Sequence, residues 1–244
     1  MKILGIIPAR YGSTRFPAKA LALLGKKTIV QRVYEQALKA KSLDKVIIAT
    51  DHSKIYDHVI GFGGEVTMTS QDHRSGTDRC HEAFSKEKDH FDYIINIQGD
   101  EPFIDPKQID LLARCFDNSV QLATLIKRIS DAKILFDPNV VKVITNTNSE
   151  AIYFSRETIP HLRGVDKAKW LEKHSYYKHI GIYGYRADIL KSITKLSASS
   201  LEKAESLEQL RWIENGYKIR VAETQIEAIG IDTPEDLEKA KELI

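Results

Sequence analysis

The sequence has few cysteines and no long apolar run, and each absence excludes a class of protein. It contains only two cysteines, Cys80 and Cys115, and neither belongs to a C-x-x-C pair, so nothing supports a zinc site or a dithiol redox site. No apolar stretch approaches the ~20 residues that span a bilayer, and the short apolar start, cut by Pro8, does not resemble a secretory signal. We therefore expect reduced thiols in a cytoplasmic protein without a membrane segment.

The sequence also lacks a strong excess of charge of either sign. Its 36 Lys and Arg residues nearly balance 34 Asp and Glu residues, for a formal net charge of +2. This balance does not describe a protein that coats nucleic acid or lies on a membrane surface. The 42% hydrophobic and 29% charged content is ordinary for a soluble globular chain. The length of 244 residues predicts one large domain, or one domain with an inserted lobe.

Two common glycine-rich phosphate motifs are missing. A P-loop requires Ser or Thr after Gly-Lys, but Gly25-Lys26 is followed by Lys27. The glycine cluster at 61–64 lacks the final glycine of a dinucleotide fingerprint, and it follows a helical segment instead of a strand. A nicotinamide-dependent enzyme is therefore disfavoured.

Apolar strand-like segments alternate with segments of helical spacing through the first half of the chain. The strand-like segments are 2–7, 45–50, 65–69 and 93–98, and the helical ones are 28–41, 76–88 and the stretch that begins at Asp105-Pro106. Thr28 with Gln31 is typical of a capping box, and Asp51 is a candidate cap for a short helix. The alternation predicts an α/β fold with an open, mostly parallel sheet and helices on both faces.

The pattern changes in the second half. Between about 121 and 187 the chain becomes rich in β-like segments, which we interpret as an inserted or edge region on the same core. A helix is predicted over 201–215, a short strand at 228–231, and a last helix from Thr233-Pro234.

The loop that leaves the first strand carries three cations among small residues. Gly12 and Ser13 allow close backbone approach to anionic oxygens. Arg10 and Arg15 can bind phosphates with two hydrogen bonds each, and Lys19 can act as a point charge. Ligands of open α/β sheets bind beyond the carboxyl ends of the strands, where this loop lies. From the loop alone, a polyphosphate site and a solvated loop with ordinary surface cations are equally good interpretations.

Acidic residues at other strand ends favour the first interpretation. Asp100 and Glu101 follow the strand-like segment at 93–98. Asp232 follows the short apolar stretch near the C-terminus and precedes a helix. Two such acids could hold Mg²⁺, which prefers carboxylate oxygens and substrate phosphates. For Asp232 the alternative is that it simply helps to start the helix.

Taken together, segments spread over the whole chain resemble the 3-deoxy-manno-octulosonate cytidylyltransferase (CMP-Kdo synthetase) family. The matching segments are IIPARYGSTRFPAK (6–19), ATDH (49–52), SGTDR (75–79), NIQGDEP (96–102), NVVKV (139–143), YFSRETIP (153–160), KHIGIYGYR (178–186), LEQLR (207–211) and GIDTPEDLE (230–238). One departure is Ala18-Lys19-Ala20, where the family more often has Gly-Lys-Pro.

The resemblance implies a reaction and an architecture. The family transfers CMP from CTP to the anomeric hydroxyl of 3-deoxy-D-manno-octulosonate (Kdo), which releases pyrophosphate and supplies CMP-Kdo for lipopolysaccharide biosynthesis. It implies a Rossmann-like three-layer fold, one nucleotidyltransferase domain over 1–244, and a β-rich dimerisation lobe at about 121–187. It further implies Mg²⁺ as cofactor and a cytoplasmic homodimer whose partners are small-molecule substrates.

The resemblance also assigns roles to matching positions. The catalytic set is Lys19, Arg15, Asp100 and Asp232, of which Asp100 and Asp232 would bind the metal. The CTP-binding set is Pro8, Ala9, Arg10, Ser13, Arg15, Lys19, Ser75, Gly76 and Gln98. The sugar-binding set is Gln98, Arg156, His179, Tyr183, Glu208 and Gln209. By spacing alone, the last five would be ordinary packing or surface residues.

Two rival functions remain at this stage. One is a cytidylyltransferase for a related sugar acid, such as 8-amino-Kdo or a sialic acid. The other is a nucleotide-sugar binding module without turnover. The presence of both Asp100 and Asp232 disfavours the second, because a pure binder has little need for two metal-binding acids.

Overall fold

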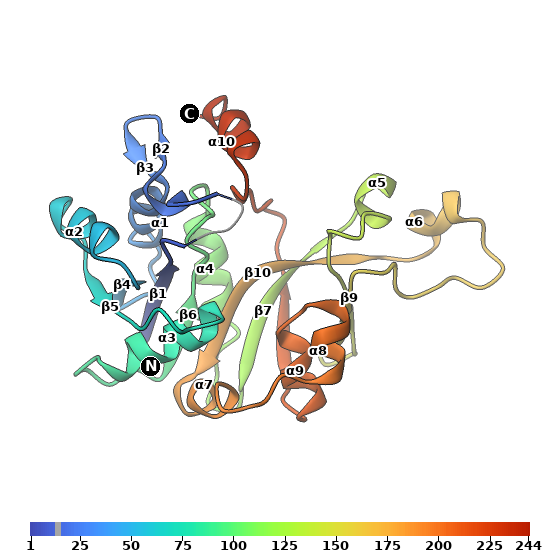
Figure 1. Ribbon diagram of the computed structural model, residues 1–244. Coiled ribbons are helices and arrows are strands. Elements are labelled where there is room, and N and C mark those ends of the chain that lie inside the picture. Colours follow the sequence, from blue (N-terminus) through green and yellow to red (C-terminus); the bar gives the residue numbers. More distant parts are fainter. Residues whose placement is uncertain (13–15) are drawn as a thin grey trace.

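The structure is a computed structural model that describes residues 1–12 and 16–244. A nine-stranded mixed sheet forms the centre of the described chain (Figure 1), with the main order β11-β7-β10-β6-β1-β4-β5. The strands of this sheet are β1 (Ile3–Ala9), β4 (Lys45–Thr50), β5 (Val66–Met68), β6 (Tyr93–Asn96), β7 (Leu122–Arg128), β8 (Lys142–Thr145), β9 (Ala151–Ser155), β10 (Tyr177–Arg186) and β11 (Ile219–Glu223). A separate small hairpin joins β2 (Leu23–Leu24) to β3 (Lys27–Thr28).

Most strands of the main path run in the same direction. β1 pairs in parallel with both β4 and β6, and β5 and β11 pair in parallel with β4 and β7. β10 is antiparallel to both of its main neighbours, β6 and β7. The predicted mostly parallel α/β sheet is confirmed. The carboxyl ends of β1, β4 and β6 therefore meet at one edge, where a ligand site is expected.

Helices cover both faces of the sheet and make three layers. The helices are α1 (Ile29–Ala37), α2 (Ser53–Gly61), α3 (Gly76–Ser85), α4 (Pro106–Ala113), α5 (Ala132–Leu135), α6 (Trp170–Lys173), α7 (Ala187–Ile193), α8 (Ser200–Glu205), α9 (Gln209–Glu214) and α10 (Pro234–Lys241), with short 3₁₀ turns η1 (Lys19–Leu21) and η2 (Lys167–Lys169). None of the helices in the described ranges has the length and apolar character needed to cross a membrane.

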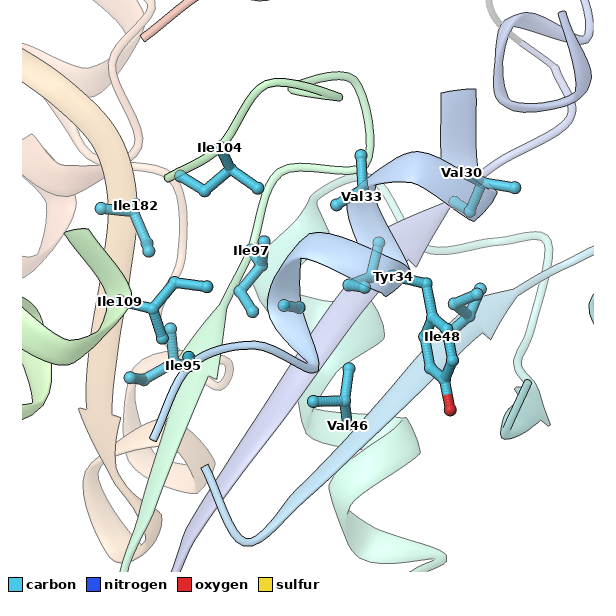
Figure 2. Packing of buried hydrophobic residues seen from close by; sticks show 14 of the residues in the cluster. Val30, Val33, Tyr34, Val46, Ile48, Ile95, Ile97, Ile104, Ile109 and Ile182 are labelled. Carbon is cyan, nitrogen blue, oxygen red and sulfur yellow. The ribbon is translucent and has the colours of Figure 1, made fainter. Parts of the chain in front are cut away.

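Each face of the sheet has its own core. Alternate side chains of β1 point to opposite faces, so Ile7 packs with α1 and α4 while Ile6 packs with α3 and α7. Figure 2 shows the first of these cores, in which Val33 of α1 and Ile109 of α4 lie over Ile95 and Ile97. Burial of these branched side chains fixes the register of the strands, and hence the positions of the loops at their ends.

The β-rich region at 121–187 divides between two locations. Its strands β7 and β10 lie inside the main sheet, between β6 and β11, instead of at an edge. The hairpin β8–β9 pairs with the far part of β10, and α5 and α6 project away from the rest of the molecule (Figure 1). Trp170 and Tyr176 belong to a small separate core in this projecting part. Its role in dimerisation stays a prediction.

Three local predictions differ from the structure. The helix predicted over 201–215 is two helices, α8 and α9, because Ser206 adopts the left-handed conformation with φ 53° and ends the first. The segment 228–231 is not a strand; it pairs with no strand of the sheet, and Ile231 N donates to Asp100 O at 2.9 Å. The cap of α2 is His52 and not Asp51, whose carboxylate is engaged elsewhere.

Candidate active site

A cavity of about 280 Å³ lies where β1 and β6 end and α3 begins. The end of β1 contributes Pro8 and Ala9 to its lining, and the loop that follows contributes Arg10 and Lys19. Other segments contribute the predicted residues Ser75, Gly76, Gln98, Asp100 and Asp232. The structure thus brings together the predicted CTP-binding and metal-binding positions that it describes, while Ser13 and Arg15 lie outside the described residues.

Lys19 joins the two predicted metal-binding acids. Its Nζ lies 2.7 Å from Asp100 Oδ2 and 3.0 Å from Asp232 Oδ1. The lysine side chain is only 15% exposed, so these charge-assisted contacts are partly sheltered from water. One cation therefore already sits between the two carboxylates.

Asp232 is not the cap of the last helix, α10. The N-cap of this helix is Thr233, which forms a reciprocal capping box with Asp236. The carboxylate of Asp232 instead contacts Lys19. A backbone hydrogen bond of 2.9 Å from Ile231 to Asp100 O holds this segment beside the end of β6.

Close approach of two backbones shapes the floor of the cavity. A Cβ placed on Gly99 would lie 2.5 Å from the carbonyl oxygen of Pro8, a distance that real side chains do not show. Only glycine fits here without a backbone shift. Because Gly99 lies against the backbone of Pro8, the next residue, Asp100, is held close to the segment that carries Lys19.

The chemistry of Asp100 and Asp232 fits a magnesium site. Carboxylates are the preferred protein ligands of Mg²⁺, which usually binds one or two of them and completes its shell with water and phosphate oxygens. Both carboxylates already face a common cation, Lys19 Nζ, at this end of the cavity. Among the described residues no cluster of three or more His, Cys, Asp or Glu could hold a metal ion.

Glu101 differs sharply from its neighbour Asp100. Its side chain is buried, and burial, followed by the nearby charge of Asp100, raises the pKa of Glu101 to about 7. The two adjacent acids therefore have different environments, one at the cavity and one in the interior.

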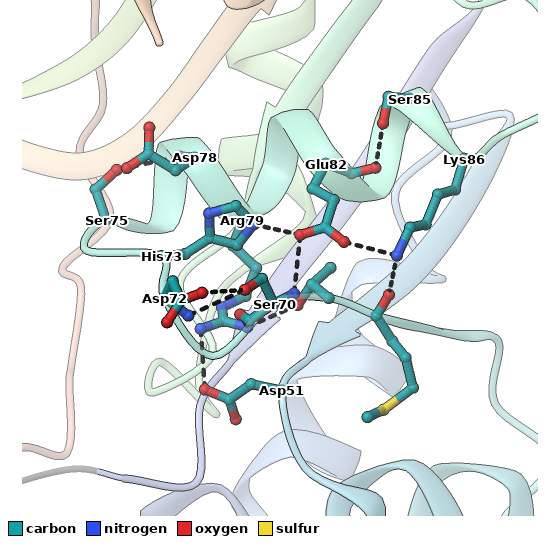
Figure 3. A network of polar contacts seen from close by, with 12 residues as sticks. Asp51, Ser70, Asp72, His73, Ser75, Asp78, Arg79, Glu82, Ser85 and Lys86 are labelled. Carbon is teal, nitrogen blue, oxygen red and sulfur yellow. Dashed lines mark hydrogen bonds and ion pairs between the residues drawn. The ribbon is translucent and has the colours of Figure 1, made fainter.

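The opposite wall of the cavity is formed by the loop before α3. Ser75 caps α3 by accepting a hydrogen bond of 3.1 Å from Asp78 N. His73 and Arg74, which sequence reasoning missed, also line the cavity. The available signal was their position directly before the predicted pair Ser75 and Gly76. Figure 3 shows His73 in contact with Glu82, in a network that holds this loop.

Several predicted sugar-binding residues lie beside the cavity, in the interior. Gln98 links the two regions, since its Nε2 donates to Gly181 O of β10 at 2.7 Å. His179 and Tyr183 lie on either side of Gly181 in β10, with ring centroids 5.1 Å apart. The Tyr183 hydroxyl and the Oδ1 of Asn96, on the paired strand, are buried without a hydrogen-bond partner in the described chain. Orphaned buried polar atoms are uncommon, and they mark this region as one that a polar ligand could complete.

Loss of hydration shifts the pKa of two of these groups. Desolvation lowers the pKa of His179, whose side chain is partly buried, to about 3, and its Nε2 lies 2.9 Å from Thr124 Oγ1. Burial raises the pKa of Glu208, although a hydrogen bond of 2.8 Å from Thr77 Oγ1 partly opposes this. His179 is thus a neutral hydrogen-bonding group at neutral pH.

The two remaining sugar-binding predictions differ in their placement. Gln209 is buried at the start of α9, next to Glu208. Arg156 follows β9, where its Nε donates to Glu205 O at 2.8 Å. None of the hydrogen bonds of Arg156 within the described chain reaches the other predicted sugar-binding residues.

Comparisons with known proteins give one consistent family. The sequence profile of a family described as cytidylyltransferase matches residues 4–219. The 3-deoxy-manno-octulosonate cytidylyltransferase of Parabacteroides distasonis is 58% identical over 245 residues, which cover 98% of this chain and 97% of that protein. The protein of the same name from Bacteroides thetaiotaomicron is 56% identical over 248 residues, which cover 100% of this chain and 98% of that protein.

Solved structures give the same result. A CMP:2-keto-3-deoxy-manno-octonic acid synthetase complexed with CTP superposes with a TM-score of 0.92 at 43% identity, over 100% of this chain and 98% of that one. A 4-diphosphocytidyl-2C-methyl-D-erythritol synthase from Anaerococcus prevotii gives a TM-score of 0.65 at 12% identity, covering 99% of this chain and 97% of that one, and shows likeness of fold alone.

Proposed function

This chain belongs to the cytidylyltransferase family, and we propose that it transfers CMP from CTP to the anomeric hydroxyl of Kdo, with release of pyrophosphate. The observation that carries the proposal is the meeting of Lys19, Asp100 and Asp232 at the cavity where β1 and β6 end. Relatives that carry the Kdo cytidylyltransferase name cover nearly the whole of this chain at 58% and 56% identity. A related sugar acid as the acceptor is the less favoured alternative.

The reaction needs positioning and neutralisation of charge more than covalent help. The sugar hydroxyl attacks the α-phosphorus of CTP while pyrophosphate leaves in line. Arg10 and Lys19 line the cavity and would bind the anionic phosphates. Lys19 would stabilise the charge that develops on the leaving pyrophosphate, and Arg15 is proposed to assist it.

Asp100 and Asp232 would hold Mg²⁺ at the end of the cavity. When bound, the ion supplies neutralisation of phosphate charge and lowers the pKa of a coordinated hydroxyl. The two carboxylates come from distant segments of the chain and both contact Lys19, so Lys19 would have to share them with the ion or move toward the phosphates. Among the described residues we assign no protein side chain as the general base.

The sugar acid would occupy the region beside Gln98, between β10 and α9. Glu208 and Gln209 provide acceptors and donors for hydroxyl groups, and the orphaned Tyr183 hydroxyl provides another. Main-chain groups near Pro8 and Ala9, with Ser75, would bind the nucleoside.

We propose two further properties of the protein in the cell. The first is a homodimer formed through the projecting part, which carries Phe136 38% exposed beside its small separate core. The second is a cytoplasmic location, where the product would feed lipopolysaccharide biosynthesis. The mass of the protein in solution, measured by light scattering, tests the dimer.

The decisive test is release of pyrophosphate from CTP and Kdo in the presence of Mg²⁺. We expect turnover with CTP and background release with ATP, GTP and UTP. Kdo is compared with 8-amino-Kdo and a sialic acid. Faster turnover with one of these acids would overturn the assignment of Kdo, and absence of turnover with all of them would overturn the proposed function.

A further inference from the structure

Asp51 forms hydrogen bonds to both walls of the proposed nucleotide cavity. One wall is the first loop, and the other is α3 with the loop before it. Asp51 follows the last residue of β4, and its side chain is only 12% exposed. One carboxylate oxygen, Oδ1, accepts a hydrogen bond of 3.0 Å from the backbone N–H of Tyr11 in the first loop. The other, Oδ2, accepts a hydrogen bond of 3.0 Å from Arg79 in α3 (Figure 3). A single carboxylate therefore bridges two segments that are distant in sequence.

On the α3 side, Arg79 carries the connection to the loop before the helix. Its side chain is 4% exposed and lines the cavity. Its Nη1 donates to Thr69 Oγ1 at 2.6 Å and to Ser70 O at 3.2 Å, while Nη2 donates to Asp51. The planar guanidinium thus fixes the loop at its start, and a buried guanidinium needs the carboxylate opposite it.

On the other side, Tyr11 carries the connection to Lys19. The carbonyl oxygen of Tyr11 accepts a hydrogen bond of 3.0 Å from Ala18 N, which closes the base of the loop just before Lys19. The Tyr11 ring stacks on His52 with centroids 3.9 Å apart, and Lys54 Nζ lies 5.5 Å from the same ring. These contacts fix the position of Tyr11, and therefore of the base of the loop, where the chain leaves after Arg10 and comes back at Ala18.

We propose that Asp51 is a positioning residue that couples the two walls of the cavity: it sets the distance between the cationic first loop and the loop at 69–75. The inference rests on the proposed function, because it concerns the binding of CTP at that cavity. It predicts that loss of the bridge weakens binding of the nucleotide, while the sugar-binding residues on β10 and α9, which Asp51 does not contact, are little affected.

The chain offers a matched control on the same strand. Lys45, at the opposite end of β4, pairs with Glu87 at 2.7 Å, and the Glu87 side chain is 10% exposed. Glu87→Gln therefore removes a carboxylate about as sheltered as that of Asp51 without touching either wall, and Lys45 keeps a second partner in Glu65 at 3.1 Å. Asp51→Asn keeps an acceptor for Tyr11 N–H but presents an amide to Arg79, and Arg79→Lys keeps the charge but loses the fork of donors.

The experiment measures steady-state KM and kcat for CTP and Kdo, together with hydrogen exchange of the ligand-free proteins. For Asp51→Asn we expect KM for CTP to rise by about tenfold or more, with KM for Kdo within about twofold of wild type. Arg79→Lys should show the same selectivity, and Glu87→Gln should leave both KM values unchanged. Amides in 9–12 and in 69–75 should exchange faster in Asp51→Asn but not in Glu87→Gln.

The proposal is overturned if exchange rises in neither wall or in one wall only, or if KM rises equally for both substrates. If Asp51→Asn does not fold, Arg79→Lys decides between the same outcomes. The exchange measurement needs no substrate, so it tests the coupling even if wild type shows no turnover with CTP and Kdo. That last result would count against the proposed function and not against the bridge.

Discussion

Asp232 Oδ1 lies 3.0 Å from Lys19 Nζ, although the two residues are 213 positions apart. The contact brings the first loop and the start of the last helix to the same end of the sheet. Asp100 meets the same lysine from the end of β6. Any account of the reaction must therefore treat the lysine and the two acids as one electrostatic unit, in which changing one residue alters the other two.

Asp100→Asn should nearly abolish turnover while the fold remains intact. The amide keeps the shape of the side chain but removes the charge that would hold Mg²⁺ and pair with Lys19. Steady-state rates at saturating Mg²⁺ and a thermal melt check both parts. Asp105→Asn serves as the control, because Asp105 caps α4 and Asn is an equally good cap. Near-normal turnover of Asp100→Asn would refute the metal role.

Gly99→Ala should damage the site by moving backbone. The new Cβ would meet Pro8 O at 2.5 Å, so the end of β1 and the loop after β6 must separate. We expect a loss of about 1–3 kcal/mol in the free energy of unfolding, and a higher KM for CTP. Urea unfolding and steady-state kinetics measure these effects. Gly61→Ala has open space around its Cβ and should change neither quantity, and an equally harmless Gly99→Ala would show that the close contact does not constrain the site.

The sequence correctly predicted those strands and helix starts that depend on residues close together in the chain. The strand predicted over 45–50 is found with the same bounds, because a short run of buried branched residues leaves few alternatives. Asp105 and Pro106 begin α4 as predicted, through a side-chain cap and a proline that fits the first helical position. Thr28 does cap α1, but that helix ends at Ala37 and not at residue 41.

The sequence did not predict features that depend on contacts between residues far apart in the chain. Nothing local in β10 indicates that it lies between β6 and β7, since its partners are distant in sequence. Asp51 has the sequence context of a helix cap, yet its carboxylate accepts hydrogen bonds from Arg79 and from the backbone N–H of Tyr11. For the site, the sequence indicated Lys19 and the two acids through their places at strand ends, whereas His73 and Arg74 carried no motif of their own.

The partly buried, desolvated His179 should make stability depend on pH. Its pKa is lowered to about 3 in the folded protein, whereas the pKa of a histidine in an unfolded chain is ~6.5. The unfolded state therefore binds more protons in this window, so stability is complete above the unfolded value and falls as pH decreases toward the folded one. His179→Gln removes this dependence. Between pH 7.5 and 5.5 the free energy of unfolding should fall by about 1.4 kcal/mol more in wild type than in the variant. Equal losses in urea unfolding would contradict the assignment of a desolvated, neutral imidazole.

Arg156→Ala should raise KM for the sugar acid, by about tenfold, far more than KM for CTP. The guanidinium is held after β9 by hydrogen bonds to carbonyl oxygens of Glu205 and Pro138, which leave further donors for a carboxylate. A purely structural role would instead lower the melting temperature and leave the ratio of the two KM values unchanged. Arg114→Ala, an exposed arginine at the end of α4, controls for the loss of one positive charge. Equal effects of Arg156→Ala on both KM values would show that this residue lies outside the sugar pocket, whose binding groups would then be the buried ones on β10 and α9.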